Sequence, residues 1–346
     1  MTISIAVVGV SGFSGLELVK LAGSRAELTV TSVLSDRWRD APLERWLPGL
    51  PARLASLVVR PQADALAAAR EADLVVLATP AEASAELAPK LLGLGRRVLD
   101  LSGAFRLTSP DVFREYYRFE HPEPALLAEA HYGLPQLPEA AGDAPRLRDA
   151  RLVANPGCYA TAAILPLAPL VAEKLAEPGA IFVDGKSGVT GAGRKVAENL
   201  LFSEVSENLT PYRVANHQHT PEIELALSRV AKTDVSVTFA PHLAPLRRGL
   251  LATTFGRLTE RGREADLHAA LRRAYESALS PFLDPVVEVV SPEEVAVKDV
   301  WGRPTARVGA RGDVRRGSFV AIGALDNLLK GAASQAMENL LGMIRP

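Results

Sequence analysis

The first 100 residues alternate short apolar runs with stretches of helical periodicity. The apolar runs are rich in Val, Ile and Leu, which is typical of strands buried on both faces of a parallel sheet. Between them, apolar residues recur at helical spacing over residues 16–22 and 84–92. We expect strands over residues 3–8, 28–34, 74–78 and 98–101. This alternation predicts βαβ units in an α/β, Rossmann-like, doubly wound domain.

Beyond residue 181 the strands predicted by the pattern become longer and fewer helices separate them. We expect strands over 234–240, 249–255 and 303–309. This favours a second, α+β domain with a mainly antiparallel sheet. The tail has the helical spacing of a terminal helix that returns to the first domain, with apolar residues at Leu328, Leu329, Ala332, Ala336, Leu340 and Met343.

Two domains are expected because a chain of 346 residues is too long for one ordinary core. We place a dinucleotide-binding domain at residues 1–157, completed by the C-terminal helix at 326–346. Residues 158–325 then form the catalytic, substrate-binding and oligomerisation domain. Large antiparallel sheets commonly supply subunit interfaces, so we expect a homo-oligomer, a dimer or a tetramer.

A glycine-rich turn follows the first expected strand and leads into helical periodicity. Its spacing is G-x-x-G-x-x-G, and such glycines let the backbone approach a pyrophosphate that sits on the helix N-terminus. An ordinary tight turn between a strand and a helix is the alternative. We predict dinucleotide binding by Gly9, Ser11, Gly12, Phe13, Ser14 and Gly15.

The end of the second expected strand should meet the cofactor ribose, about 20 residues beyond the last glycine. Asp36 at this point would suit a free 2′-hydroxyl group. Ser35, Arg37 and Arg39 would suit a 2′-phosphate, although surface arginines also occur in solvated loops. The arginines favour NADP as the cofactor.

Cysteine occurs once, in a turn that leads into an expected helix. Pro156 and Gly157 favour a sharp turn that exposes the thiol of Cys158. The first-turn N–H groups and the helix macrodipole favour negative charge there, and the thiolate is the reactive form. A free cysteine is commonly a small buried apolar residue instead, so the nucleophile hypothesis depends on partners.

His217 and His219 stand just ahead of a helix in which Thr220 is a plausible N-cap and Pro221 a first-turn residue. A histidine beside a cysteine nucleophile can give and take protons. The pair could also bind a metal, but neither C-x-x-C nor H-x-x-x-H spacing accompanies it, so we expect no metal. We predict Cys158 acting with one of the two histidines.

Three further segments are candidates for binding an anionic metabolite. Ser102 and Arg106 follow the strand that ends near residue 101, at the carboxyl edge where open α/β sheets bind ligands. The glycine-rich, basic segment 186–194 could hold a phosphate or carboxylate with its backbone N–H groups. The segment 241–249 adds Arg247 in another basic turn. A solvated loop is the alternative for each segment.

The amino-acid composition limits the kinds of ligand and the compartment that we expect. The net charge of −1 and the aromatic content of 5% argue against nucleic acid, so we expect a small-molecule substrate. No apolar run approaches the roughly 18 residues of a membrane span. A single cysteine forms no internal disulfide, which fits a reducing compartment, and the N-terminus lacks the features of a signal peptide. We therefore expect a soluble, cytoplasmic protein.

These segments together resemble the N-acetyl-γ-glutamyl-phosphate reductases of arginine biosynthesis, which are relatives of aspartate-semialdehyde dehydrogenase. The matching segments run in the family's order over nearly the whole chain; they are 9–15, 100–107, 155–159, 186–195, 217–222 and 326–332. The P-G-C-Y turn, the S-G-x-x-G-A-G-R-K run and H-x-H-x-P-E-I are specific. The family pattern often has Arg where this chain has Gln218.

The resemblance implies NADPH-dependent reductive dephosphorylation of N-acetyl-γ-glutamyl phosphate to the semialdehyde, through a thioester on Cys158. A histidine of the H-x-H segment is the acid/base in that family, and we favour His219, with His217 as an orienting or substrate contact. We assign substrate and phosphate binding to Ser102, Arg106, Lys186, Arg194, His217, Glu222 and Arg247. We assign further cofactor contacts to Ser187, Gly188 and Asn327.

Two other functions compete with this prediction. One is a reductase of carrier-protein-linked aminoadipyl phosphate in lysine biosynthesis, which belongs to a sister family with similar motifs. The other is a non-catalytic dinucleotide sensor in which Cys158 is a redox switch. A sensor has no need of the H-x-H and basic glycine-rich segments, which favours the enzyme.

Overall fold

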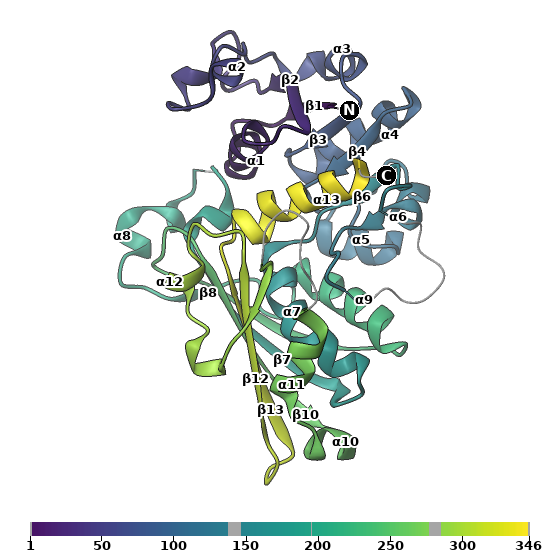
Figure 1. The fold of residues 1–346 in the computed structure, drawn as a ribbon, viewed down its shortest axis with the longest axis vertical. Coiled ribbons are helices and arrows are strands. Elements are labelled where there is room, and N and C mark those ends of the chain that lie inside the picture. The colour runs from purple at the N-terminus through teal and green to yellow at the C-terminus, as the bar shows by residue number, and fades with distance from the viewer. Residues whose placement is uncertain (1, 138–146, 195, 277–284, 345–346) are drawn as a thin grey trace. The chain divides into compact units, whose positions relative to one another are not determined.

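The computed structural model describes residues 2–137, 147–194, 196–276 and 285–344. The chain divides into two compact units. The first unit comprises Met1–Gly133, Pro145–Pro156 and Ala332–Pro346, and the second comprises Leu134–Ala144 and Gly157–Gly331. Each unit has its own sheet (Figure 1).

The first unit contains a six-stranded sheet in the order β2-β1-β3-β4-β6-β5. Every pairing in it is parallel. All four residues of β3 are buried, as expected for a strand covered on both faces. The strands are β1 (Ile3–Val8), β2 (Leu28–Leu34), β3 (Leu74–Leu77), β4 (Arg97–Asp100), β5 (His131–Tyr132) and β6 (Leu152–Ala154). The predicted Rossmann-like domain is therefore confirmed.

Helices cover this sheet because alternate strand residues point to opposite faces. Ala6, Val8, Val75 and Leu77 share one buried cluster with residues of α3 and α4 and with Phe113 of α5. The elements are α1 (Phe13–Gly23), η1 (Leu43–Arg45), α2 (Ala52–Ala55), η2 (Gln62–Asp64), α3 (Ala65–Arg70), α4 (Ala81–Gly93), α5 (Pro110–Tyr117) and α6 (Ala125–Glu129).

The terminal helix α13 (Ser334–Ile344) packs within the first unit against α1 and β4 (Figure 1). Its buried Asn339 donates hydrogen bonds to the carbonyl oxygen of Gly133 at 2.8 Å and to Oδ1 of Asn155 at 2.9 Å. A π-helical turn, η6 (Leu329–Ala333), precedes it. The predicted return of the final helix to the first domain is confirmed, and its regular α-helical part begins at Ser334.

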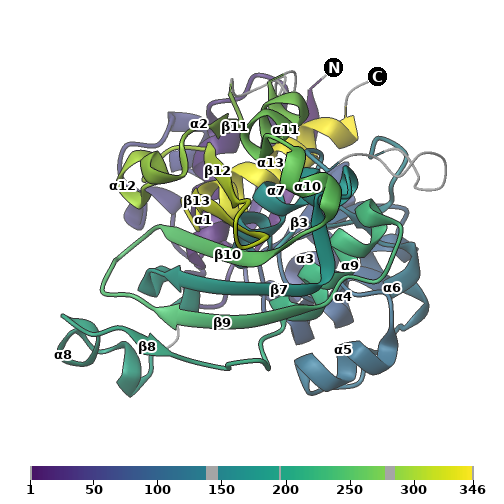
Figure 2. The same cartoon turned by 90° about the horizontal axis from the view of Figure 1, so that it is seen from below.

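The second unit contains a seven-stranded sheet in the order β11-β12-β13-β10-β7-β9-β8. Four pairings are antiparallel, and two, β7 with β9 and β11 with β12, are parallel. Figure 2 shows the long strands β10, β7 and β9 side by side. The strands are β7 (Ala176–Ser187), β8 (Thr210–Pro211), β9 (Val237–Leu243), β10 (Leu250–Leu258), β11 (Val287–Val289), β12 (Ala306–Asp313) and β13 (Ser318–Leu325). The sheet is mixed but mainly antiparallel, as predicted.

One face of this second sheet is covered by α7 (Cys158–Ala172), which also packs against α9 (His219–Ala231). Residues 159–171 of α7 are all buried, so the helix is apolar all round. The other face leaves Phe182 of β7 and Phe255 of β10 exposed as direct cross-strand neighbours. The remaining elements are η3 (Val189–Ala192), η4 (Glu198–Leu200), α8 (Phe202–Val205), α10 (Glu260–Glu264), α11 (Leu267–Tyr275), η5 (Pro292–Glu294) and α12 (Val297–Val300).

Candidate active site

The glycine loop of the first unit lies at the carboxyl ends of β1 and β3, where the strand order reverses. Gly9 has a φ of 93°, and a Cβ built on it would lie 2.4 Å from the carbonyl oxygen of Ala78. A Cβ on Gly15 would lie 2.6 Å from the carbonyl oxygen of Gly9. Helix α1 begins directly after Gly12, which has no side chain to cap it. The first-turn N–H groups of α1 can therefore face an anion.

Ser35, at the end of β2, is joined to this loop. Its hydroxyl donates to Oγ of Ser11 at 2.7 Å and accepts from the backbone N–H of Arg37 at 3.2 Å. Oδ1 of Asp36 accepts a hydrogen bond from the backbone N–H of Gln62 at 2.8 Å. Ser11, Ser35 and Arg37 therefore lie together, and the Asp36 carboxylate is hydrogen-bonded to the backbone.

Arg106 and Ser102 lie beyond the carboxyl end of β4 in the same unit. Arg106 is nearly buried, and its guanidinium donates to the carbonyl oxygens of Asn155 at 2.8 Å and Leu101 at 2.9 Å. Ser102 donates its hydroxyl to the buried carboxylate of Asp100 at 2.7 Å. Burial raises the pKa of Asp100. Arg106 therefore ties together the chain segments that follow β4 and β6.

In the second unit, Cys158 is the first residue of α7 and is partly exposed. The turn before it is held by Glu222 of α9, whose Oε1 accepts a hydrogen bond from the Gly157 N–H at 2.8 Å. Gly331, in η6, lies against the cysteine, and a Cβ built on it would lie 2.7 Å from Cβ of Cys158. The N-terminus of α7 places its dipole beside the thiol and favours negative charge there.

Both histidines lie in the second unit beside this turn and are buried. Nε2 of His219 lies 3.9 Å from Oε2 of Glu222, which is too long for a hydrogen bond but within ion-pair distance when the ring is protonated. Nδ1 of His217 accepts a hydrogen bond from the backbone N–H of His219 at 3.1 Å. Burial, followed by the charges of His219 and Arg213, lowers the pKa of His217 to about 2. His217 is therefore neutral at physiological pH.

Two tyrosines pack around the histidines. The ring centroids of Tyr159 and His217 lie 5.8 Å apart, and those of Tyr212 and His217 lie 5.6 Å apart. Tyr159 donates its hydroxyl to the carbonyl oxygen of His242 at 2.9 Å. Burial raises the pKa of Tyr159, and it also raises the pKa of Tyr212, to about 12. Both hydroxyls stay protonated and can act as hydrogen-bond donors.

Ser187, Gly188 and Asn327, predicted from three places in the sequence, converge at the end of β7. Asn327 accepts from the Gly249 N–H at 2.7 Å and donates to Oγ1 of Thr190 at 3.0 Å. The Gly188 N–H donates to the Gly249 carbonyl oxygen at 2.9 Å. Asn327 thus fastens the loop after β7 to the loop before β10.

Lys186 faces away from this cluster. Gly185 contacts the Tyr159 side of the sheet, so strand alternation turns Lys186 to the opposite face, where Nζ lies 2.5 Å from Oδ2 of Asp184. Arg247 is exposed and lies over the ring of Trp301 at 5.5 Å. Arg194 is also exposed. Of the three predicted anion-binding residues, Lys186 therefore points to the sheet face opposite Tyr159, and the other two are exposed.

Comparisons with known proteins bear on both units. The family description "Semialdehyde dehydrogenase, NAD binding domain" matches residues 4–144, and "Semialdehyde dehydrogenase, dimerisation domain" matches residues 158–327. A relative from Citrifermentans bemidjiense, named N-acetyl-gamma-glutamyl-phosphate reductase, is 37% identical over 98% of this chain and 94% of its own. A relative of the same name from Syntrophobacter fumaroxidans is 39% identical over 97% of this chain and 94% of its own. The chain belongs to the N-acetyl-γ-glutamyl-phosphate reductases of the semialdehyde dehydrogenase family.

Solved structures agree with this N-acetyl-γ-glutamyl-phosphate reductase fold. A probable aspartate-semialdehyde dehydrogenase from Pseudomonas aeruginosa superposes with a TM-score of 0.74 at 21% identity, covering 100% of this chain and 99% of its own. An aspartate semialdehyde dehydrogenase from Candida albicans, solved with NADP, gives a TM-score of 0.70 at 13% identity, covering 99% and 98%. The fold and the oxidoreductase class predicted from the sequence are confirmed.

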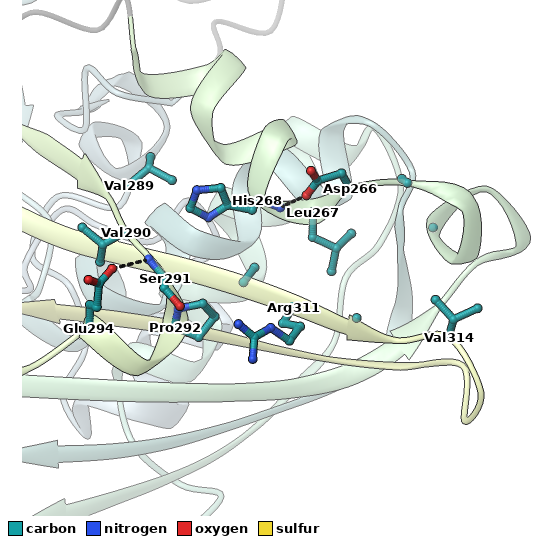
Figure 3. A pocket seen from close by; sticks show the side chains of 14 residues that line it. Asp266, Leu267, His268, Val289, Val290, Ser291, Pro292, Glu294, Arg311 and Val314 are labelled. Carbon is teal, nitrogen blue, oxygen red and sulfur yellow. Dashed lines mark hydrogen bonds between the residues drawn. The ribbon is translucent and has the colours of Figure 1, made fainter.

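A separate cavity in the second unit of this reductase, about 580 Å³ in volume, lies between α11, β12 and the loop after β11 (Figure 3). Several of its polar groups have partners in the protein. Asp266 accepts from the N–H groups of His268 and Ala269 and caps α11, while Ser291 and Glu294 form a capping box. Its lining does not include Cys158 or either site histidine, so we assign it no part in the chemistry.

Three residues to which the sequence gave no individual role lie beside the Cys158 turn or the histidines. They are Gly331, Tyr212 and Arg213, which are brought in by the π-helical turn and by the segment after β8. Among the described residues there is no cluster of three or more His, Cys, Asp or Glu side chains placed to hold a metal ion. In that part of the chain no helix is long and apolar enough to cross a bilayer.

Proposed function

We propose that this protein reduces N-acetyl-γ-glutamyl phosphate to N-acetylglutamate semialdehyde and phosphate with NADPH, in arginine biosynthesis. One observation carries the proposal. Glu222 joins the two groups that the chemistry needs, because one oxygen accepts from the Cys158 turn and the other faces His219. The names of the full-length relatives supply the substrate class.

Acylation begins with Cys158 as the nucleophile. The thiolate attacks the carbonyl carbon of the acyl phosphate, a C–S bond forms, and the C–O bond to phosphate breaks. The first-turn N–H groups of α7 favour the thiolate at this position. The product of this step is a thioester on Cys158, and phosphate takes the electron pair of the broken bond.

The residues of the glycine loop fit a dinucleotide. Side chains at Gly9 and Gly15 would collide with the backbone of the loop and of Ala78, so the loop can pack closely only with glycine at these positions. The hydrogen-bonded hydroxyls of Ser11 and Ser35 lie at the end of β2. NADPH, when bound, supplies a hydride to the thioester carbon. His219 donates a proton to the resulting oxyanion and takes it back as the C–S bond breaks, which releases the aldehyde and the thiolate.

His219 suits this role better than His217. A general acid must hold a proton near neutral pH, and burial keeps the pKa of His217 at about 2. Its Nδ1 also accepts the His219 N–H, so His217 orients the first turn of α9. Glu222 lies within ion-pair distance of His219 and is a positioning residue for the Cys158 turn.

We propose NADP rather than NAD as the cofactor. The Asp36 carboxylate is engaged by the Gln62 N–H and is less available to a 2′-hydroxyl group, while Ser35 and Arg37 adjoin the loop. Arg37→Ser should raise the KM for NADP about tenfold or more and leave the KM for NAD unchanged, because a charge-assisted hydrogen bond contributes about 1.5–3 kcal/mol. Equal changes in both KM values would refute this assignment.

We also propose that residues 1–157 with 326–346 bind the dinucleotide, and that 158–325 carry the chemistry and the homo-oligomer interface. The exposed pair Phe182 and Phe255 supports self-association through the outer face of the second sheet. Phe255→Glu should give the 36.9 kDa mass of one chain by light scattering. Phe202→Glu, on the exposed α8, is the matched control and should keep the oligomer.

The reaction is tested in the reverse direction, which uses stable reactants. NADP, N-acetylglutamate semialdehyde and phosphate should give phosphate-dependent NADPH, followed by its absorbance. Cys158→Ser should abolish turnover and retain NADP binding, because the thiol acts in the chemistry and the glycine loop in binding. A wild-type protein that binds NADP but turns over only the aminoadipyl analogue would overturn the substrate assignment.

A further inference from the structure

The segment after β8 holds Arg213 in an uncommon backbone conformation. The N–H groups of Tyr212 and Ala215 donate to the carbonyl oxygens of Pro241 at 3.0 Å and Phe239 at 2.9 Å, which fixes the segment along β9. Arg213 and Ala215 have φ values of 45° and 55°, in the left-handed region that side chains other than Gly and Asn rarely adopt. Such strained positions concentrate at functional sites.

This turn aims the Arg213 guanidinium at the residue between the two histidines. Its Nη1 donates to Oε1 of Gln218 at 2.5 Å, and Gln218 is the N-cap residue of α9. The charge of Arg213 is close enough to contribute to the lowered pKa of His217. The guanidinium is therefore held by an amide oxygen that leaves its charge uncompensated.

Two other cations of the second unit are paired with carboxylates. Lys186 pairs with Asp184, and Arg248 pairs with the buried Asp326 at 2.5 Å. Within the described part of the chain, no carboxylate lies within ion-pair distance of Arg213. An uncompensated guanidinium beside the histidines attracts an anion, and its fork geometry matches a carboxylate.

We propose that Arg213 binds the carboxylate of the substrate and so selects acyl phosphates and aldehydes that carry one. This inference rests on the proposed function, in which the substrate has both a carboxylate and a phosphate. Gln218 orients the guanidinium, and the left-handed turn at Arg213 and Ala215 brings it to the start of α9. Arg213 acts in specificity, and Cys158 and His219 act in the chemistry.

The test uses the reverse reaction with two aldehydes, N-acetylglutamate semialdehyde and 4-acetamidobutanal, which lacks the carboxylate. Arg213→Asn removes the charge and keeps a residue that tolerates the left-handed region. It should raise the KM for the semialdehyde roughly ten- to hundred-fold, the scale of a lost charge-assisted hydrogen bond. The KM for phosphate, the KM for NADP and kcat should change little. The wild-type preference for the carboxylate-bearing aldehyde should collapse.

Two variants sharpen the result. Arg213→Lys should recover part of the affinity, and Arg315→Met, in the exposed turn between β12 and β13, should leave every KM unchanged. An active wild-type enzyme whose preference survives in Arg213→Asn would overturn the inference and leave the proposed function intact. A rise in the KM for phosphate alone would overturn the carboxylate assignment. A wild-type enzyme inactive on both aldehydes would refute the proposed function and, with it, this role for Arg213.

Discussion

Acid should destabilise this protein in part through His217. The side chain is buried beside the rings of Tyr159 and Phe239, and its neutral form accepts the N–H of His219. Burial lowers its pKa from 6.5 to about 2. The unfolded chain therefore binds a proton at this ring more readily than the folded chain, so the stabilisation is complete above pH 6.5 and is lost as the pH falls.

The size of the effect follows from the two pKa values. At about pH 5 the unfolded histidine is protonated and the folded one is not, and the free energy of unfolding falls by about 2 kcal/mol relative to pH 7. This figure holds for any folded-state pKa of His217 below about 4, because only the unfolded histidine then titrates between pH 7 and pH 5. The loss continues toward pH 2, where the folded ring also titrates.

His217→Asn isolates this contribution. An Asn Oδ1 can take the place of the ring Nδ1 as acceptor for the His219 N–H, and the variant lacks the titration. We expect it to be less stable at neutral pH, since packing against the aromatic rings is lost, but to lose about 2 kcal/mol less than the wild type between pH 7 and pH 5 in urea unfolding. His268→Asn, in the cavity lining, is the control and should follow the wild type. Parallel pH profiles for wild type and His217→Asn would refute the buried, neutral histidine.

Three further outcomes are expected. Gly331→Ala should displace Cys158 and lower kcat by up to about a hundred-fold. Gly179→Ala is the control and should leave kcat unchanged, because a Cβ there has no atom within 4 Å. Equal kcat values for the two variants would contradict the contact between Gly331 and Cys158. Glu222→Gln keeps an acceptor for Gly157 but removes the charge near His219, so kcat should fall on the order of tenfold, and Glu222→Asp should lose less. Gly9→Ala should cost about 1–3 kcal/mol of stability by thermal unfolding, whereas Gly93→Ala should be neutral or stabilising.

Much of the fold is visible in the sequence because its signals are local. The strands β1 to β4 coincide with the runs rich in Val, Ile and Leu. Gly15 needs to be glycine because of a contact with Gly9, six residues earlier in the same turn. The position of Cys158 at the start of α7 was likewise predicted from the Pro-Gly pair before it. The two-residue strands β5 and β8 carry too little pattern to be predicted.

The surroundings of the site depend on contacts that no local pattern encodes. The sequence places Lys186 in a glycine-rich loop, but in the structure β7 extends to Ser187. Because successive side chains of a strand point to opposite faces, the lysine is turned away from Tyr159. Arg213 gives no sequence signal, because its turn is fixed by hydrogen bonds to β9 and its partner lies five residues along the chain. Gly331 meets Cys158 only through the π-helical turn before α13.

Glu222 explains why the cysteine and the acid/base can be supplied by separate helices. A carboxylate has two oxygens, and here they are divided between the N–H that precedes α7 and the imidazole at the start of α9. Because Glu222 is one turn into α9, its hydrogen bond to Gly157 couples the position of that helix to the turn that carries Cys158. The carboxylate is almost fully buried, so water does not compete for either oxygen. One side chain thus sets both the geometry of the nucleophile and the charge beside the acid/base.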